Sequence, residues 1–214
     1  MHQGAILLTA LVTAAAGGAL APWVRTVASS DSVWLSRRIQ VLLAGLGGAG
    51  ASTLAHGPAE LVGFVLLALA CALLVGIDLA VYRLPDIIVG PMYPILLGAL
   101  TVQAAIDGGD WTRLGRAAAG GAASAIGYLV LALLVPSGLG LGDVKLAGLL
   151  GAFLGWAGWP HVLLGALAAF GLNAVVAAVL LLSRRVTRRG ATAFGPWMVA
   201  GAAVGAFWGP ALGP

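Results

Sequence analysis

Charged side chains are scarce in this 214-residue chain: Asp, Glu, Lys and Arg together make up 8% of it, whereas apolar residues make up 61%. The mean hydropathy is +1.04. A soluble domain cannot cover its surface with so few charges, so the composition excludes a water-soluble enzyme or binding module. Apolar runs near the ~20 residues that cross a bilayer recur along the chain, which indicates a membrane protein.

Cysteine is nearly absent as well. Cys71 is alone, so the chain has no disulfide framework and no cysteine-based zinc site. His2, His56 and His161 are far apart in the sequence and near predicted outer helix ends, which argues against a histidine metal site. We therefore expect neither a metal nor another cofactor.

Eight hydrophobic segments recur along the chain. They cover residues 4–22, 40–56, 61–82, 87–106, 117–136, 142–157, 161–182 and 194–212. The second is the weakest, because the glycines between Gly45 and Gly50 make it short and flexible. The pattern predicts an all-α, polytopic integral membrane protein with about eight transmembrane helices. No separate soluble domain is visible, so we expect residues 1–214 to form a single membrane-embedded domain.

The basic residues orient these segments. If the N-terminus lies outside and eight helices follow, nine of the eleven Lys and Arg residues fall in inner loops. The outer loops hold only Arg113 and Arg116, alongside Glu60, Asp107 and Asp110. The positive-inside rule favours this arrangement, which also places the C-terminus outside. The basic run 184–189 then faces anionic membrane lipid, and we expect no nucleic-acid binding. Four tryptophans fit an outer aromatic belt: Trp111, Trp156, Trp159 and Trp208.

Two aspartates interrupt the apolar pattern. Asp78 lies near the inner end of the third segment, and Asp143 opens the sixth. An ionisable side chain at membrane depth costs roughly 2.5 to 3.5 kcal/mol on insertion scales, so each carboxyl marks a candidate functional site. Two helices intervene, an even number, which puts both carboxyls on the cytoplasmic side at similar depth. Two neighbouring carboxyls that share a proton can activate water, as in aspartic proteases.

The residues around the aspartates suit a substrate site. Pro85 disfavours helix at Leu84, so the third helix should end within two turns of Asp78. Glycines at 138, 140 and 142 leave room for an extended peptide to pair its backbone with the loop. Taken alone, the glycine alternation fits a tight turn between helices equally well.

Three motifs together resemble a known family. They are Ile77-Asp78, Leu84-Pro85-Asp86 and Gly140-Leu141-Gly142-Asp143-Val144-Lys145-Leu146, and a fourth element, Phe194-Gly195-Pro196, opens the last segment. In residues and in spacing the chain resembles the prepilin peptidases, or type IV leader peptidases, which are membrane aspartyl proteases of the Gly-x-Gly-Asp kind. The resemblance covers about residues 59–212.

The resemblance implies that Asp78 and Asp143 are the catalytic pair of an aspartic endopeptidase. It implies cleavage on the cytoplasmic face of a bacterial plasma membrane, after a glycine, of the short basic leader of type IV prepilin or pseudopilin precursors. By the same resemblance, an apolar helix of the precursor directly follows the cleavage site. The other motif residues are candidates for substrate binding: Leu84, Pro85, Asp86, Gly140, Gly142 and Lys145. Larger members carry Cys-x-x-Cys pairs and an associated N-methylation activity between their first two helices, and residues 23–39 of this chain contain no cysteine.

Lys145 has two interpretations. Its ammonium group can extend to the membrane interface, or it can attract an acidic group of the substrate and act on Asp86 or Asp143. For the catalytic pair, the helix dipole favours negative charge on Asp143, at a helix start, over Asp78, near a helix end. We therefore predict that Asp143 is the ionised base and Asp78 the protonated acid.

Two other functions are alternatives to the peptidase. The aspartates can form a proton or cation relay in a small transporter, a class that often shows paired inverted repeats. No convincing internal repeat is visible in the sequence. The chain can also be a purely structural partner in a pilus assembly platform.

Overall fold

The computed structural model describes residues 2–134, 139–182 and 193–209. Within these ranges the chain forms helices and no strand. The helices are α1 (His2–Ala28), the 3-10 helix η1 (Val33–Leu35), α2 (Arg37–Leu54), α3 (Pro58–Val81), α4 (Asp86–Ile106), α5 (Trp111–Leu134), α6 (Leu141–Ala157), α7 (Trp159–Leu182) and α8 (Gly195–Trp208). Over the described residues, each predicted hydrophobic segment corresponds to a helix; the ends of the segments 117–136 and 194–212 lie outside them. Gly138 and the basic run 184–189 lie outside the described residues.

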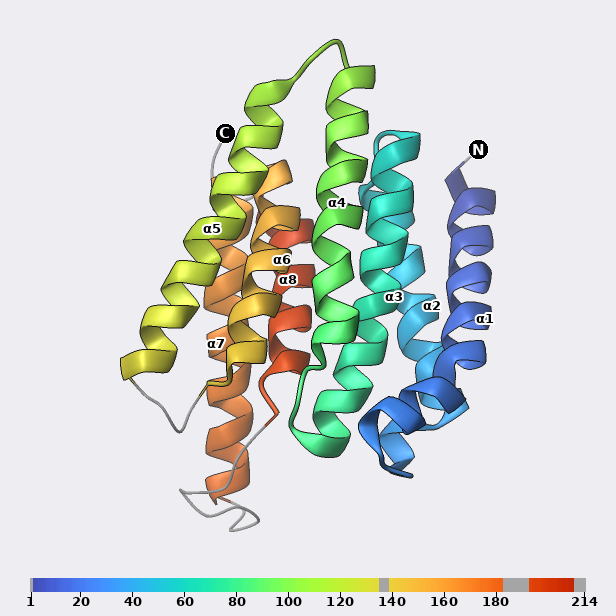
Figure 1. Ribbon diagram of the computed structural model, residues 1–214, viewed down its shortest axis with the longest axis vertical. Helices are drawn as coiled ribbons and strands as arrows, with labels where there is room; N and C mark the ends of the chain where they lie inside the picture. The colour runs from blue at the N-terminus through green and yellow to red at the C-terminus, as the bar shows by residue number, and fades with distance from the viewer. Residues whose placement is uncertain (1, 135–138, 183–192, 210–214) are drawn as a thin grey trace.

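The α-helices run alongside one another and alternate in direction, so the bundle has two ends (Figure 1). α1 and α2 lie at one side, α5 and α7 at the other, and α3, α4, α6 and α8 lie between them. At one end, α3, α5 and α7 finish and α4, α6 and α8 begin. Both aspartates lie at this end, as the even number of intervening helices predicts.

Among the described residues, five helices are long and apolar enough to cross a membrane: α1 from Gln3, α3, α4, α5, and α7 up to Val179. Of the others, α6 has 17 residues and α8 has 14. These lengths correspond to about 25 and 21 Å, which is less than the ~30 Å hydrocarbon core. The protein is therefore an all-α, multi-pass membrane protein. Its orientation in the membrane stays a prediction.

Small residues set the distances between the paired helices. A Cβ atom added at Gly151 of α6 would lie 2.6 Å from the carbonyl oxygen of Gly120 in α5. One added at Gly201 of α8 would lie 2.5 Å from the carbonyl oxygen of Gly165 in α7. Only glycine allows the backbones to approach so closely, which is the usual way helices associate in lipid.

A buried polar group joins three helices at the opposite end of the bundle. Glu60 of α3 is 1% exposed, and its Oε1 accepts a hydrogen bond from Trp156 Nε1 of α6 at 2.7 Å. Arg113 of α5 places a guanidinium nitrogen 3.0 Å from the same oxygen and lies over the Trp156 ring, 4.2 Å from its centroid. The predicted aromatic belt is therefore wrong for Trp156, which is 1% exposed because it packs inside this group.

Candidate active site

Asp78 lies in the last turn of α3, where the helix stops at Val81. The stop falls within two turns of Asp78, as Pro85 predicts. Tyr82 follows in the left-handed conformation (φ 54°), and its N–H still donates to the Asp78 carbonyl oxygen. The Asp78 side chain is 4% exposed, and its Oδ2 accepts a hydrogen bond from the backbone N–H of Gly195 at 2.8 Å. The first residue of α8 therefore holds this carboxyl.

Asp143 lies in the first turn of α6 and is half-buried. Its Oδ2 accepts a hydrogen bond from the backbone N–H of Gly140, the residue just before the helix, at 2.9 Å. A carboxylate in this place satisfies a main-chain donor that the helix itself leaves without a partner. The Gly140-x-x-Asp143 spacing thus fixes the carboxyl relative to α6.

The two carboxyls are brought together by the packing of α3, α6 and α8. Asp78 contacts the start of α8 directly, and the start of α6 packs against the turn that follows α3. A Cβ atom added at Gly142 would lie 2.9 Å from the Leu84 Cβ, so glycine is needed for this approach. Both carboxyls therefore lie at the end of the bundle where α3 finishes and α6 and α8 begin. This arrangement suits a pair that shares one proton.

Asp86 and Lys145 form an ion pair beside the aspartates. Lys145 Nζ lies 2.6 Å from Asp86 Oδ2, which joins the start of α4 to the start of α6. A second link between the same helices is the hydrogen bond from the Tyr93 hydroxyl to the Lys145 carbonyl oxygen, at 2.7 Å. Both side chains of the pair are largely exposed. The first interpretation of Lys145, extension to the interface alone, is therefore incomplete, because its ammonium group is bound to Asp86.

The other predicted motif residues surround this end of the bundle. Leu84 and Pro85 are half-buried in the turn between α3 and α4, and Gly140 is exposed just before α6. Gly142 lies in the first turn of α6, against Leu84. The motif residues, although distant in the sequence, thus come together at the ends of α3, α4 and α6.

An aromatic cluster, which the sequence analysis did not identify, adjoins the aspartates. Tyr128 of α5, Phe170 of α7 and Phe194 have ring centroids 5.2 to 6.1 Å apart. Tyr128 is buried, and its ring packs against that of Phe194, the residue before Gly195, whose N–H binds Asp78. Tyr128 follows Ser124 by four residues, so both polar side chains lie on one face of the predicted helix. This spacing was the sequence signal that could have identified Tyr128.

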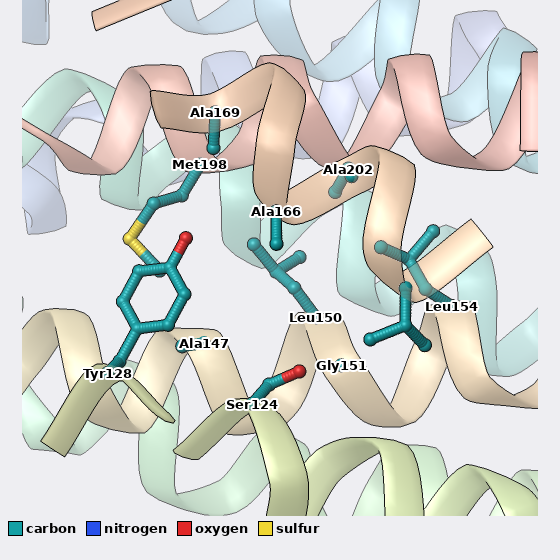
Figure 2. Close-up of a pocket in the computed structure, with 12 residues that line it drawn as sticks. Ser124, Tyr128, Ala147, Leu150, Gly151, Leu154, Ala166, Ala169, Met198 and Ala202 are labelled. Atoms are coloured by element: carbon teal, nitrogen blue, oxygen red, sulfur yellow. The ribbon is translucent and has the colours of Figure 1, made fainter. Parts of the chain in front are cut away.

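A small cavity lies beside this cluster, among α5, α6, α7 and α8. In Figure 2 the Tyr128 side chain extends from α5 toward Ala169 and Met198, and Ser124 lies on the same helix near Gly151. The cavity volume is about 20 Å³, which is room for about one water molecule. The cavity is too small for a peptide, so it does not compete as a substrate site.

Metal binding has no candidate site in the part of the chain that the structure describes. There, His, Cys, Asp and Glu side chains form no group of three that could hold an ion.

Comparisons with known proteins identify the family to which the chain is similar. The model of the type IV leader peptidase family matches residues 64–182, a range that contains both aspartates. The prepilin leader peptidase/N-methyltransferase of Aeromonas hydrophila is 34% identical over 186 residues, which cover 81% of this chain and 58% of that protein. The chain thus spans less than two thirds of the length of this curated relative. No solved structure matches the chain.

Proposed function

Because the chain belongs to the type IV leader peptidase family, we propose that it is an aspartic endopeptidase that removes the leader from type IV prepilin-like or pseudopilin precursors. The observation that carries this proposal is the pair Asp78 and Asp143, each held by a backbone N–H at the same end of the bundle. The comparisons give no support to the alternative of a proton- or cation-coupled transporter.

The two carboxyls divide the work of hydrolysis. The ionised carboxyl takes a proton from water, and the water oxygen attacks the carbonyl carbon of the scissile bond. The protonated carboxyl donates its proton to the carbonyl oxygen. When the tetrahedral intermediate collapses, the C–N bond breaks and the leaving amine takes the proton held by the base. At the same time a hydroxyl of the intermediate returns its proton to the other carboxylate as the C=O bond of the product carboxylic acid forms, which restores both groups. In each carboxyl Oδ2 is held by a main-chain N–H, so we assign Oδ1 to the water or the scissile carbonyl.

The substrate features follow from the surroundings of the pair. A basic leader requires acidic groups near the site, and Asp86 is 68% exposed beside it. Gly140, just before α6, and Leu141, the first residue of α6, lie at the surface, where an extended leader can pair with the backbone of the segment that precedes the helix. We propose that the leader lies here and that cleavage follows a glycine, on the cytoplasmic side.

Asparagine substitutions test the proposed activity. Asp78→Asn and Asp143→Asn keep the shape of each side chain but remove its ionisation. Each should lower cleavage of a co-expressed precursor by at least about 10²-fold, the lower end of the effect of a general acid or base. The measurement is the ratio of processed to unprocessed precursor at equal enzyme levels in the membrane. Normal processing by both variants would refute the proposal.

The same two variants test which carboxyl holds the proton. We predict that the infrared band of a protonated carboxyl in the resting enzyme disappears in Asp78→Asn and survives in Asp143→Asn. The opposite pattern reverses the assignment of acid and base. Site-resolved infrared spectra are needed because coupled carboxyls titrate as a pair, and a pH–rate profile does not assign them.

A further inference from the structure

An apolar groove of about 360 Å³ lies between α2 and α8, with α3 and α6 behind it. Small residues make up much of its walls: Gly47 and Gly50 of α2, Ala68 and Ala72 of α3, and Ala200 and Ala203 of α8. At the end of the groove away from the aspartates, the Phe207 ring of α8 faces α2, since a Cβ atom added at Gly50 would lie 3.7 Å from it. No part of the catalytic mechanism uses this groove.

The groove is continuous with both catalytic carboxyls along the faces of their helices. On α3 it is lined by Cys71 and Val75, which lie seven and three residues before Asp78. On α6 it is lined by Leu150, seven residues after Asp143. Seven residues are about two helical turns, so Asp78 and Asp143 lie on the same helix faces as the groove residues.

The start of α8 also links the groove to Asp78, in addition to the helix faces of α3 and α6. Pro196 lines the groove, and the preceding residue, Gly195, donates the backbone hydrogen bond to the Asp78 carboxyl. The groove therefore extends along α3, α6 and α8 to the end of the bundle where the two catalytic carboxyls lie.

A second apolar groove, of about 370 Å³, does not have this property. It lies among α1, α3 and α4, and its α3 residues include Leu66, Leu69 and Leu73. Asp78 follows Leu73 by five residues, which turns it by about 140° away from this face. A chain in this second groove would contact Ile87 and Ile88 of α4 but would lie on the wrong side of α3 for Asp78.

We propose that the groove between α2 and α8 binds the apolar helix of the precursor, the segment that directly follows the cleavage site. This inference rests on the proposed function. The occupant is a helix because small wall residues let a helix backbone approach closely, which a lipid chain does not require. A helix seated here by a few large apolar side chains places its leader end at Asp78 and Asp143, as in other helix-in-groove complexes.

Filling the groove tests the proposal. Ala203→Phe introduces a ring into the wall, and Ala123→Phe on α5 is a matched control, since both alanines are exposed and lie inside a helix. We expect Ala203→Phe to lower kcat/KM for a full-length precursor at least about tenfold, mainly through KM, and Ala123→Phe to match the wild type. Equal cleavage by the two variants overturns the groove assignment. Failure of the wild type to cleave any precursor overturns the proposed function instead.

Photo-crosslinking provides a measurement that does not depend on the folding of Ala203→Phe. A photoreactive residue replaces Ala203, or Ala123 as the control, in the Asp143→Asn protein, which retains the precursor. We expect the adduct to the apolar helix of the precursor to be at least about tenfold stronger from position 203. Adducts only to lipid or to a second copy of the protein, or equal adducts from both positions, overturn the proposal.

Discussion

At the scale of single residues, Gly195 controls the orientation of Asp78. Its N–H binds the carboxyl, and a Cβ atom added at this position would lie 2.9 Å from Asp78 Oδ2. Gly195→Ala should therefore displace Asp78 and lower the cleavage rate about tenfold or more, which corresponds to about 1.4 kcal/mol in the barrier. Gly98→Ala on α4 is the control, because nothing lies within 4 Å of its added Cβ. Rates measured on one precursor compare them, and equal rates would contradict the role of Gly195.

Substitutions of Asp86 and Lys145 should change KM in opposite directions if Asp86 binds the leader. If Asp86 attracts the basic leader, Asp86→Asn should raise KM severalfold, and Lys145→Met should lower KM because it releases Asp86. If the pair only joins α4 to α6, both variants lose the same interaction and change KM alike. Exposed ion pairs contribute about 0.2–1 kcal/mol to stability, so both proteins should fold. Both shifts in KM should shrink at high salt, which screens exposed charges.

The site was predictable in part from single residues. Asp78 and Asp143 stand out because ionisable groups are rare in apolar segments, and counting helices placed them at one end. The partner of Asp78 was not predictable. Gly195 is 117 residues away along the chain, and only the packing of α8 against α3 brings its N–H to the carboxyl. Tyr128 was not predicted because the candidate site residues were identified by their charge. An uncharged phenol among small residues gives a weak signal.

At the scale of elements, Glu60 joins α3, α5 and α6. Its carboxylate is the acceptor for Trp156 Nε1 and the counter-charge of Arg113. Glu60→Ala leaves both groups without their buried partner, and breaking a buried pair in this way costs about 3–5 kcal/mol. We expect a clear fall in the thermal unfolding midpoint in detergent, with cleavage kept at low temperature because Glu60 lies at the end opposite the aspartates. Asp31→Ala, at an exposed position, is the control and should leave the midpoint unchanged.

The helices were predictable because runs of apolar residues mark them, but their ends were not. Residue 22 was expected to end the first segment, yet α1 continues through Pro22 to Ala28. Proline removes one backbone hydrogen bond, and membrane helices tolerate this where nearby groups satisfy the freed carbonyl. Trp156 was misplaced for a related reason. Its sequence position near a helix end fits the interface, and only the buried carboxylate of Glu60 explains why it lies inside.

At the scale of the whole molecule, α1 and α2 pack against each other and lie outside the residues that the family model matches. The match begins at residue 64, whereas α2 supplies one wall of the groove that leads to Asp78. The groove therefore combines residues inside and outside the matched range. The family-like core of residues 59–212 and the single domain of residues 1–214 stay predictions.

The orientation in the membrane decides which compartment the active site faces. We predict that the bundle end with Asp78 and Asp143 is cytoplasmic, since Arg37, Arg38 and Arg83 lie in or next to the turns at this end, whereas Arg113 and Arg116 lie toward the other end. Single cysteines test this in a Cys71→Ala protein: Val33→Cys, at an exposed position at the aspartate end, and Thr112→Cys, exposed at the other end. A membrane-impermeant maleimide should label Thr112→Cys in intact cells and Val33→Cys only after the membrane is permeabilised. The reverse pattern would place the carboxyls outside, where a leader that stays in the cytoplasm never reaches them.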